Sequence, residues 1–501
     1  MHPLYSVAEI RGIEHLAAQR LPEGALMQRA GQAGANAALD LLPFSTSRAR
    51  VLVLAGPGNN GGDALETAAH LAHAGAQVTL LHFAPNGEPS PERAAALFRA
   101  RHSAVTFADL SLAEISGGDW SLVIDGLFGI GLSRPLEGAM AILVSTINQL
   151  GCPLLALDVP SGLDADKGCV IGANDIAVRA THTVTFIGNK PGLHTCDGRD
   201  HAGLVQINNL DLEASLFPSS RTHLNDVKLF ARHIHSRRHN SHKGSFGNVA
   251  VLGGANGMVG APVLAGRTAL LTGAGRVYLC FAGEALPYDS GQPELMCRSA
   301  LGFDFDSAIV VAGPGLGTSS DSRAVLAIAA AGAQALVLDA DALNIMAEDS
   351  ALCDAIAQRS AETVLTPHPL EAARLLGASA ASVQSDRLRA ARELASRFKA
   401  TVILKGSGTV LASPRGDAVI NNTGNPGLAT AGTGDVLAGL CGSLLAQGWP
   451  GWEAALAAAW LHGMAADVLV TEGTGPIGLT ASELVPAIRV ALNRMVEHHG
   501  R

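Results

Sequence analysis

The sequence is poor in aromatic residues and lacks any paired cysteine motif. Phenylalanine, tryptophan and tyrosine make up 4% of its 501 residues, and its seven cysteines are scattered with no Cys-x-x-Cys pair. An odd, scattered set argues against a disulfide framework and against a zinc knuckle. We therefore expect reduced cysteines, as in a cytoplasmic protein.

A basic stripe and a long apolar run are also missing. The formal net charge of −9 is diffuse, so the pattern favours neither nucleic acid nor an anionic membrane as a partner. No apolar run approaches the ~18 residues of a membrane span, and the first nine residues lack the basic-then-apolar start of a signal peptide. We expect no membrane and no nucleic-acid partner.

Small and apolar residues are abundant, with 57 glycines and 48% hydrophobic residues. This composition suits α/β layers, and the length leaves room for about two to four domains. Strand-like runs alternate with helix-like segments at residues 51–55, 78–83, 122–125, 154–158 and 183–187, and again at 249–252, 276–280, 308–312, 335–339, 363–365 and 401–404. The alternation predicts an α/β protein of two domains, the first a Rossmann-like doubly wound sheet.

The apolar pattern lapses between residues 216 and 243, where four histidines and several arginines follow one another. These histidines could form a metal site, but a basic, solvated linker is the favoured interpretation. We place the domain boundary here, which gives domains of residues 1–222 and 223–501.

The most distinctive segment is Asn-Pro-Gly-Leu-Ala-Thr-Ala-Gly-Thr-Gly-Asp at residues 425–435, which leads into a helix-like pattern. Gly432, Thr433 and Gly434 can turn backbone N–H groups inward at a helix start, which makes an anion site. A carboxylate there repels phosphate oxygens, so Asp435 is interpreted as a base for a substrate hydroxyl in phosphoryl transfer. The alternative is an ordinary helix N-cap.

A glycine-rich loop follows the first predicted strand. Gly-Pro-Gly-Asn-Asn-Gly at residues 56–61 satisfies the Gly-x-Gly-x-x-Gly pattern of a dinucleotide-binding turn. The match is weak, because the acidic residue expected about 20 residues further on is missing. Asn59, Asn60 and Asp63 instead offer polar groups suited to ribose hydroxyls or a cation.

Two further strands of the first half end in carboxylates, Asp125 and Asp158. The carboxyl ends of parallel strands line the ligand crevice of an open α/β sheet. Asn60, Asp125 and Ser161 could therefore converge as oxygen ligands of a hard cation, and the glycines and arginine of residues 129–135 suit phosphates. Taken singly, each carboxylate is more often a cap.

These motifs carry a family resemblance. Residues 58–63, 125–135 and 158–164 together resemble the NAD(P)H-hydrate epimerase domain, over residues 1 to about 220. The second half resembles the ADP- or ATP-dependent NAD(P)H-hydrate dehydratases of the ribokinase-like superfamily at residues 241–249, 253–261, 313–317, 338–344, 366–371, 405–409 and 432–435. The fused order is similar to the bifunctional nicotinamide nucleotide repair family of bacteria.

The resemblance implies an enzyme that repairs hydrated NADH and NADPH. The N-terminal domain would epimerise the R and S hydrates. The C-terminal domain would dehydrate the S hydrate with ADP, by phosphorylation and phosphate elimination, and would give NAD(P)H, AMP and phosphate. It also implies K⁺ in the epimerase domain and Mg²⁺ with the ADP; we further expect a homo-oligomer.

The resemblance also assigns residues. Asp158 and Asp435 would be catalytic, and K⁺ would lie on Asn60, Asp125 and Ser161. The nucleotide would contact Lys405, Gly406, Ser407, Gly408, Thr409 and Gly434. The hydrate would contact Asn59, Asn60, Gly61, Gly62, Asp63, Gly129, Ile130, Gly131, Leu132, Ser133, Arg134, Pro135, Asp158, Ala261, Gly317, His368 and Asp435. His368 lies between two prolines and could equally be a packed loop residue.

Two other functions remain open from the residues. A vitamin or sugar kinase shares the Gly-Thr-Gly-Asp run but releases a stable phosphorylated product. The N-terminal half could be a non-catalytic nucleotide-binding module, because Rossmann-like folds often lose chemistry. The presence of Asn60, Asp125 and Asp158 argues against that second alternative.

Overall fold

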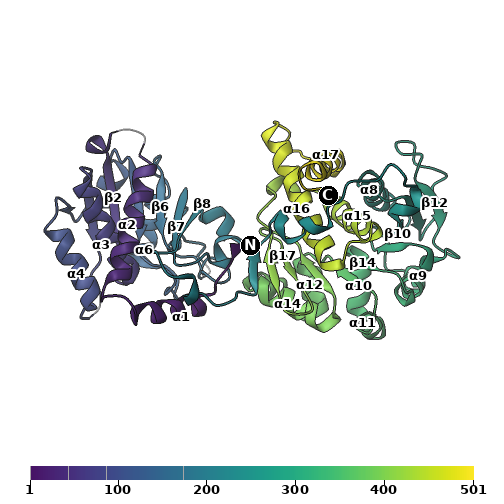
Figure 1. Cartoon of the computed structure of the whole chain (residues 1–501), viewed down its shortest axis with the longest axis horizontal. Coiled ribbons are helices and arrows are strands. Elements are labelled where there is room, and N and C mark those ends of the chain that lie inside the picture. The colour runs from purple at the N-terminus through teal and green to yellow at the C-terminus, as the bar shows by residue number, and fades with distance from the viewer. Residues whose placement is uncertain (1, 43–44, 86, 173, 501) are drawn as a thin grey trace. The chain divides into compact units, whose positions relative to one another are not determined.

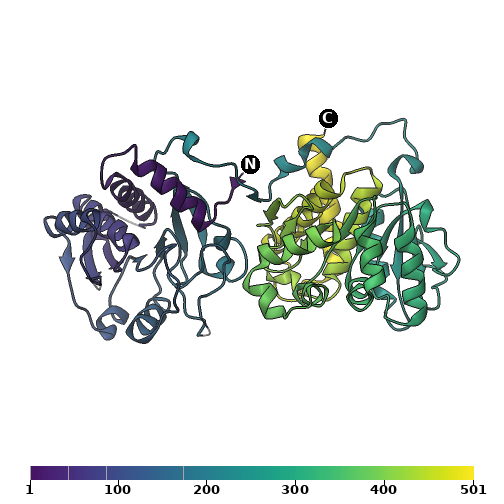
Figure 2. The ribbon, with the colours of Figure 1, turned by 90° about the horizontal axis from the view of Figure 1, so that it is seen from below.

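The computed structural model describes residues 2–42, 45–85, 87–172 and 174–500 (Figures 1 and 2). The chain divides into two compact units, one of residues 3–222 and one of residues 223–500 together with His2. Each unit is an α/β layer structure on a mostly parallel sheet. The predicted fold class is confirmed.

The N-terminal unit is built on a seven-stranded parallel sheet with the order β4-β3-β2-β5-β6-β7-β8. Its strands are β2 (Arg50–Ala55), β3 (Gln77–His82), β4 (Thr106–Phe107), β5 (Leu122–Gly126), β6 (Leu154–Leu157), β7 (His182–Phe186) and β8 (Leu204–Asn208). Its helices are α1 (Val7–Ala18), α2 (Ala25–Asp40), α3 (Asn59–His73), α4 (Pro91–Arg101), α5 (Leu112–Ser116), α6 (Gly138–Ile147) and α7 (Gly198–His201).

Helices cover both faces of this sheet, and the residues of β2 show how. Val51 and Val53 belong to one core, with the apolar faces of α1, α2, α3 and α4, which lie on the same side (Figure 1). Leu52 and Leu54 point the other way, into a second core with α5 and α6. Because β2 is buried on both faces, its sequence at residues 51–55 is a continuous apolar run.

The strand order places a ligand crevice in the N-terminal unit. From β2 the chain adds β3 and β4 on one side of the sheet and then β5 to β8 on the other. Loops leaving the carboxyl ends of β2 and β5 therefore diverge, and such a switch point is where open α/β sheets bind ligands.

The C-terminal unit follows the same plan. Its eleven-stranded sheet has the order β1-β9-β18-β17-β16-β15-β14-β13-β10-β11-β12, with parallel pairing from β10 to β16 and antiparallel pairing of β16, β17 and β18. The strands are β1 (His2–Pro3), β9 (Thr222–Leu224), β10 (Asn248–Gly253), β11 (Arg276–Phe281), β12 (Met296–Ser299), β13 (Ile309–Ala312), β14 (Leu336–Leu338), β15 (Thr363–Leu365), β16 (Thr401–Leu404), β17 (Val410–Ala412) and β18 (Ala418–Ile420). The switch point lies between β10 and β13.

The helices of this unit form layers on its sheet. They are α8 (Gly260–Leu271), α9 (Ser320–Ala331), α10 (Ala340–Glu348), α11 (Ser350–Ala357), α12 (Pro369–Leu376), α13 (Ala380–Ser385), α14 (Arg387–Phe398), α15 (Thr433–Ala446), α16 (Gly451–Thr471) and α17 (Ala481–His499). The central α15 packs between α8 and α16 (Figure 1). Because α15 is covered on both sides, nearly every residue after its first turn is buried.

Helix α16 corrects one expectation from the sequence. This helix of 21 residues has the length and the apolar composition of a membrane-spanning helix. The sequence nevertheless shows no uninterrupted apolar run of that length. Glu453, His462 and Asp467 break the run without lowering its mean hydropathy below that of a span. In the structure 61% of its apolar window is buried against the rest of the unit, which is the position of a core helix.

The prediction of a solvated linker between residues 216 and 243 is correct only for the last part of that segment. Residues 235–245 are exposed, and their histidines join no group of three metal-ligating side chains within the described ranges. Before them, however, Phe230 and Ile234 are buried in the C-terminal core. Asn225 is buried as well and donates to Asn421 Oδ1 (2.9 Å) and Leu456 O (2.9 Å). Because arginines and histidines surround Phe230 and Ile234, the sequence pattern did not indicate that these two residues are buried.

We expect Phe230→Ala to lower the free energy of unfolding of the C-terminal unit by about 3 to 5 kcal/mol, because its ring is fully buried beside Trp449 and Trp460. Urea unfolding followed by tryptophan fluorescence measures the change. Phe98→Ala is the control, since that ring is 61% exposed. Equal stability of the Phe230 variant and the wild type would contradict the packing of this segment.

Candidate active sites

A cavity of about 870 Å³ opens at the carboxyl ends of the strands of the N-terminal unit. It lies at the predicted switch point, between the loop after β2 and the loop after β5. Most of the predicted hydrate-binding residues of this half line it, namely Asn59, Asn60, Asp63, Gly129, Ile130, Gly131, Leu132, Ser133, Arg134 and Asp158.

Gly61 and Gly62 do not line the cavity and have a packing role instead. Both are buried in α3, which begins at Asn59 inside the glycine-rich loop. A Cβ on Gly61 would lie 1.9 Å from the backbone oxygen of Gly56, and one on Gly62 would lie 2.5 Å from Met27 Cε. The two glycines let the helix approach its neighbours and so bring Asn60 and Asp63 to the cavity.

Asp125 and Ser161 form a buried hydrogen-bonded pair below the cavity floor. Asp125 accepts from the backbone N–H of Ser161 (2.8 Å) and from its hydroxyl (2.7 Å). Burial raises the pKa of Asp125 to about 6, against the lowering effect of these bonds. Asn60 is also buried; its amide donates to Leu157 O (3.1 Å), while its Oδ1 has no hydrogen-bond partner among the described residues.

Asp158 forms an ion pair that the sequence did not reveal. Its Oδ1 accepts from Lys190 Nζ at 2.5 Å, and the ammonium also donates to Thr185 Oγ1 (2.8 Å) and Phe186 O (2.7 Å). The Lys190 side chain is fully buried, whereas Asp158 is 13% exposed and lines the cavity. Asp158 adopts a left-handed backbone conformation (φ 67°), uncommon for a residue with a side chain and frequent at functional sites.

More carboxyl groups surround this pair than the sequence predicted. Glu14 and Glu92 line the cavity together with Asp63 and Asp158. Burial, followed by the charges of Asp158 and Glu14, holds the pKa of Asp63 well above its usual range. Asp158 differs from Asp63 in that its carboxylate accepts a hydrogen bond from Lys190 Nζ.

In the C-terminal unit, the Gly-Thr-Gly-Asp run forms the amino end of α15. Gly432 is the N-cap, in a left-handed conformation (φ 91°) that favours glycine, and Asp435 lies in the first turn. No side chain caps this helix, so the interpretation of Asp435 as the N-cap is wrong. The N–H group of Thr433 donates to Thr430 O (3.4 Å), whereas those of Gly434 and Asp435 have no acceptor among the described residues and are available to an anion.

The environment of Asp435 raises its pKa towards neutrality. Burial raises its pKa to about 7, and the neighbouring charge of Asp339 acts in the same direction, while Lys405 opposes them. A carboxyl with a pKa near the working pH can both accept and release a proton. This observation favours the general-base interpretation of Asp435.

Lys405 lies at the anion loop and is paired with Asp339. Its Nζ donates to Asp339 Oδ1 at 2.7 Å, and the same oxygen accepts from Thr366 Oγ1 (2.7 Å). A Cβ on Gly434 would lie 3.3 Å from the lysine Nζ. Residues 406–409 continue from Lys405 beyond the end of β16, at the same edge of the sheet. Asp339 ends β14 as Asp125 and Asp158 end theirs, and that signal could have identified it from the sequence.

His368 caps α12 while facing the same site. Its Nδ1 accepts from the backbone N–H groups of Leu370 (3.1 Å) and Glu371 (3.2 Å). Burial, followed by the charge of Lys405, lowers its pKa. The residue is therefore a neutral cap whose ring is half-exposed near Lys405, so a packing role and a binding role are compatible.

Ala261 and Gly317 come together at the switch point of this unit. Ala261 is in the first turn of α8, after β10, and Gly317 follows β13 with a left-handed backbone (φ 68°). The backbone N–H of Gly317 donates to Asp341 Oδ2 (2.8 Å), and a Cβ on the adjacent Gly315 would lie 3.2 Å from Ala261 Cβ. The predicted residues of the second half thus gather around one edge of the sheet.

The fold and the sites define the class of the protein: a two-domain α/β enzyme with a Rossmann-like and a ribokinase-like half. Known families match both halves. The NAD(P)H-hydrate dehydratase family matches residues 249–489, and the family described as YjeF-related protein N-terminus matches residues 23–192.

Individual relatives match either nearly the whole chain or its C-terminal half. It is 37% identical to the bifunctional NAD(P)H-hydrate repair enzyme of Coxiella burnetii, over 98% of this chain and 100% of the relative. The ADP-dependent (S)-NAD(P)H-hydrate dehydratase of Neisseria meningitidis is 46% identical over 56% of this chain and 96% of its own length. The crystal structure of a Bacillus subtilis ADP/ATP-dependent NAD(P)H-hydrate dehydratase with ATP and Mg²⁺ is 27% identical, with a TM-score of 0.48, and covers 54% of this chain and 98% of its own.

The chain therefore belongs to the family of bifunctional NAD(P)H-hydrate repair enzymes. The resemblance carried by the sequence motifs is confirmed. A vitamin or sugar kinase with a non-catalytic N-terminal module is not favoured, because the matched relatives are repair enzymes over both halves.

We expect Lys190→Met to lower the free energy of unfolding of the N-terminal unit by about 3 to 5 kcal/mol, because the substitution leaves the charge of Asp158 without its buried partner. Arg20→Met is the control. Arg20 pairs with Glu213 on the surface, where both side chains are more than half exposed, so its loss should cost under about 1 kcal/mol. Denaturant unfolding of each variant measures both effects, and equal costs would contradict a special role for the buried pair.

Proposed function

We propose that this chain repairs hydrated NADH and NADPH in two steps at two sites. The N-terminal unit interconverts the R and S hydrates, and the C-terminal unit dehydrates the S hydrate with ADP, giving NAD(P)H, AMP and phosphate. One observation carries the proposal: a buried carboxyl of pKa about 7, Asp435, lies in the first turn of a helix whose amino end is open to phosphate.

The substrate explains why a kinase fold would perform a dehydration. Water has added across a ring double bond and has left a hydroxyl on the carbon beside the ring nitrogen, and hydroxide is a poor leaving group. Transfer of a phosphoryl group to that hydroxyl makes a good leaving group. The nitrogen lone pair then expels phosphate, and loss of a proton from the neighbouring ring carbon restores the double bond of the reduced ring.

In this step Asp435 takes the proton of the hydroxyl while the β-phosphoryl group of ADP transfers. The N–H groups of residues 432–434 and the ammonium of Lys405 stabilise the charge on the transferring oxygens. Residues 405–409 with Gly434 hold the nucleotide, and Ala261, Gly317 and His368 hold the hydrate. Mg²⁺ fits the oxygen donors at this edge, of which the carboxylate of Asp339 is the nearest to Lys405.

In the N-terminal unit, Asp158 is the proposed acid/base of epimerisation. The reacting carbon is a hemiaminal, so nitrogen-assisted loss and return of water, or reversible ring opening, inverts it once a carboxylate handles the proton. Lys190 holds the Asp158 carboxylate in place through the 2.5 Å bond from its Nζ to Oδ1. Residues 129–134 line the cavity and would contact the phosphates of the cofactor, whereas the predicted Pro135 is outside the lining.

Asn60, Asp125 and Ser161 would hold the potassium ion. The buried Oδ1 of Asn60 has no hydrogen-bond partner among the described residues, and Asp125 and Ser161 add a carboxylate and a hydroxyl. The ion would compensate the charge of the buried carboxylate and order the loops after β2, β5 and β6.

We expect Asp435→Asn to reduce the dehydration rate by about 10² to 10⁴, because the base is lost while the backbone anion site remains. Regain of the reduced-nicotinamide absorbance with ADP measures the rate, and ADP binding by calorimetry should be unchanged. In the wild type the rate should fall about tenfold for each pH unit below 7, since protonated Asp435 cannot act. Near-normal turnover in the variant would contradict the role of Asp435 as the base and would leave it a structural role only.

We expect Asp158→Asn to leave dehydration of the S hydrate intact but to stop conversion of a mixed-epimer substrate partway. The isosteric amide keeps the loop and removes the proton acceptor. The progress curve should show a fast phase and then a plateau, whereas the wild type runs to completion. A variant that matches the wild type after subtraction of spontaneous inversion would exclude Asp158 as the acid/base.

A further inference from the structure

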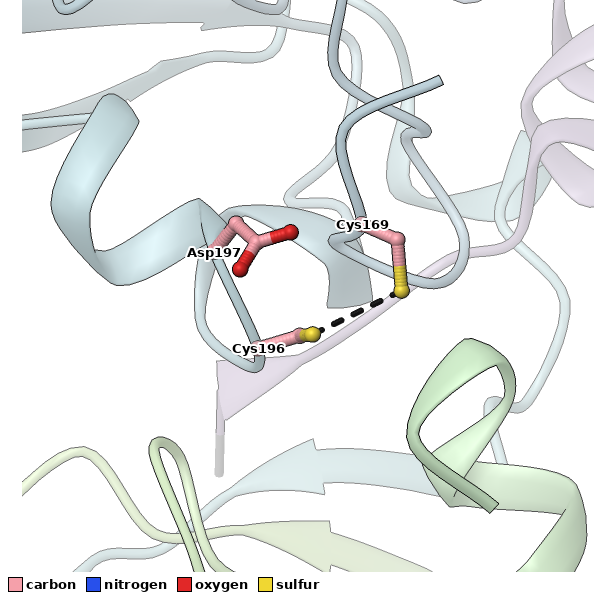
Figure 3. Close-up of side chains that lie close together, drawn as sticks. All are labelled: Cys169, Cys196 and Asp197. Atoms are coloured by element: carbon pink, nitrogen blue, oxygen red, sulfur yellow. Dashed lines mark hydrogen bonds between the residues drawn. The ribbon is translucent and has the colours of Figure 1, made fainter. Parts of the chain in front are cut away.

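Three metal-ligating side chains gather in the N-terminal unit outside the cavity lining. Figure 3 shows the sulfur atoms of Cys169 and Cys196 facing each other, with the carboxylate of Asp197 beside them. The two sulfur atoms are 3.5 Å apart, and one ligand atom from each of the three residues lies within 4.8 Å of the others. None of the three is assigned a part in the proposed reactions.

Two loops bring these groups together, and backbone hydrogen bonds hold the loops to each other. Gly198 N donates to Gly168 O (2.9 Å), and Gly192 N donates to Ala165 O (2.8 Å). Asp197 Oδ2 accepts from the backbone N–H of Val170 (3.0 Å). The donors are therefore positioned by the fold and do not depend on a bound ion for their approach.

We propose that Cys169, Cys196 and Asp197 bind one thiophilic divalent cation, which their donor set identifies as Zn²⁺, with water as the fourth ligand. Two thiolates and a carboxylate are ligands that Zn²⁺ takes in tetrahedral sites. Zn–S bonds of about 2.3 Å at a tetrahedral angle place two sulfur atoms roughly 3.8 Å apart, so the observed separation needs little adjustment. All three residues are half-buried, which leaves a path for the ion and its water.

A disulfide between the two cysteines is the competing outcome. Its formation needs a thiolate and an oxidant such as a peroxide, which takes two electrons from the pair. The geometry favours the metal site, because a carboxylate oxygen of Asp197 lies within 4.8 Å of both sulfur atoms. That carboxylate has a role as a ligand in a metal site, and it has none in a disulfide.

The bound ion would join the two segments that carry the Asp158–Lys190 pair. Cys169 follows the loop of Asp158 and Ser161, and Cys196 follows Lys190 by six residues. The expected effect is therefore a more stable N-terminal unit, with the ion bound outside the cavity lining.

Cobalt substitution of the full wild-type chain tests the proposal without any variant. The protein is stripped with a chelator, kept reduced with a phosphine and titrated with Co²⁺. We expect a sulfur-to-cobalt charge-transfer band that saturates at about one equivalent and is displaced by Zn²⁺. The band is specific to thiolate ligands, so binding to the exposed histidines of residues 235–242 does not produce it. Absence of the band would overturn the proposal.

Substitutions then locate the site. Cys169→Ser and Cys196→Ser should each abolish the band, and Asp197→Asn should weaken Zn²⁺ binding by at least about tenfold. Cys152→Ser is the matched control, a half-buried cysteine of the same unit outside the cluster. Zn²⁺ should also raise the melting temperature of the wild type and of Cys152→Ser, but not that of Cys169→Ser or Cys196→Ser. A band that persists in both of those variants, or a disulfide and no metal in the wild type, would overturn the assignment.

Discussion

Both sites depend on a lysine ammonium held against a carboxylate at the carboxyl end of a parallel sheet. Lys190 pairs with Asp158 at 2.5 Å and Lys405 with Asp339 at 2.7 Å. An isolated charge at such a place costs several kcal/mol, and the pairing offsets this cost. Burial then raises the pKa values of other carboxyl groups at these sites: that of Asp435 to about 7, against the lowering effect of Lys405, and that of Asp63 well above its usual range.

The two halves use the same sheet geometry for different chemistry. In each, the strand order reverses beside the first long strand, so loops diverge and leave a site at the carboxyl ends. In the N-terminal unit the loops enclose a cavity rich in carboxyl groups, which suits proton transfer at a single carbon. In the C-terminal unit they frame the amino end of α15, which suits the transfer of a phosphoryl group. A repair reaction needs both, because phosphorylation of a chiral hydroxyl accepts one configuration.

Glycines at points of close backbone contact allow the geometry of these sites. α3 approaches the loop after β2 and helix α2 closely because Gly61 and Gly62 lack a Cβ, and Gly432 allows the left-handed turn at which α15 begins. The Cys169 and Cys196 loops are held in the same way, since a Cβ on Gly168 would lie 2.2 Å from the backbone oxygen of Thr195. Side chains that are far apart in sequence thus meet at distances set by the backbone.

Local patterns in the sequence determined the α/β class, the buried strands, and the carboxylates Asp125 and Asp158, because continuous apolar runs that end in a polar residue mark the ends of parallel strands. The Gly-Thr-Gly run before a helix-like pattern likewise identified Asp435. Tertiary structure alone decided which groups pair. Lys190, 32 residues from Asp158, and Lys405, 66 residues from Asp339, find their partners only when distant strands align. It also decided that Phe230 and Ile234 belong to the core and that α16 is a core helix, because burial depends on neighbours that the local sequence does not contain.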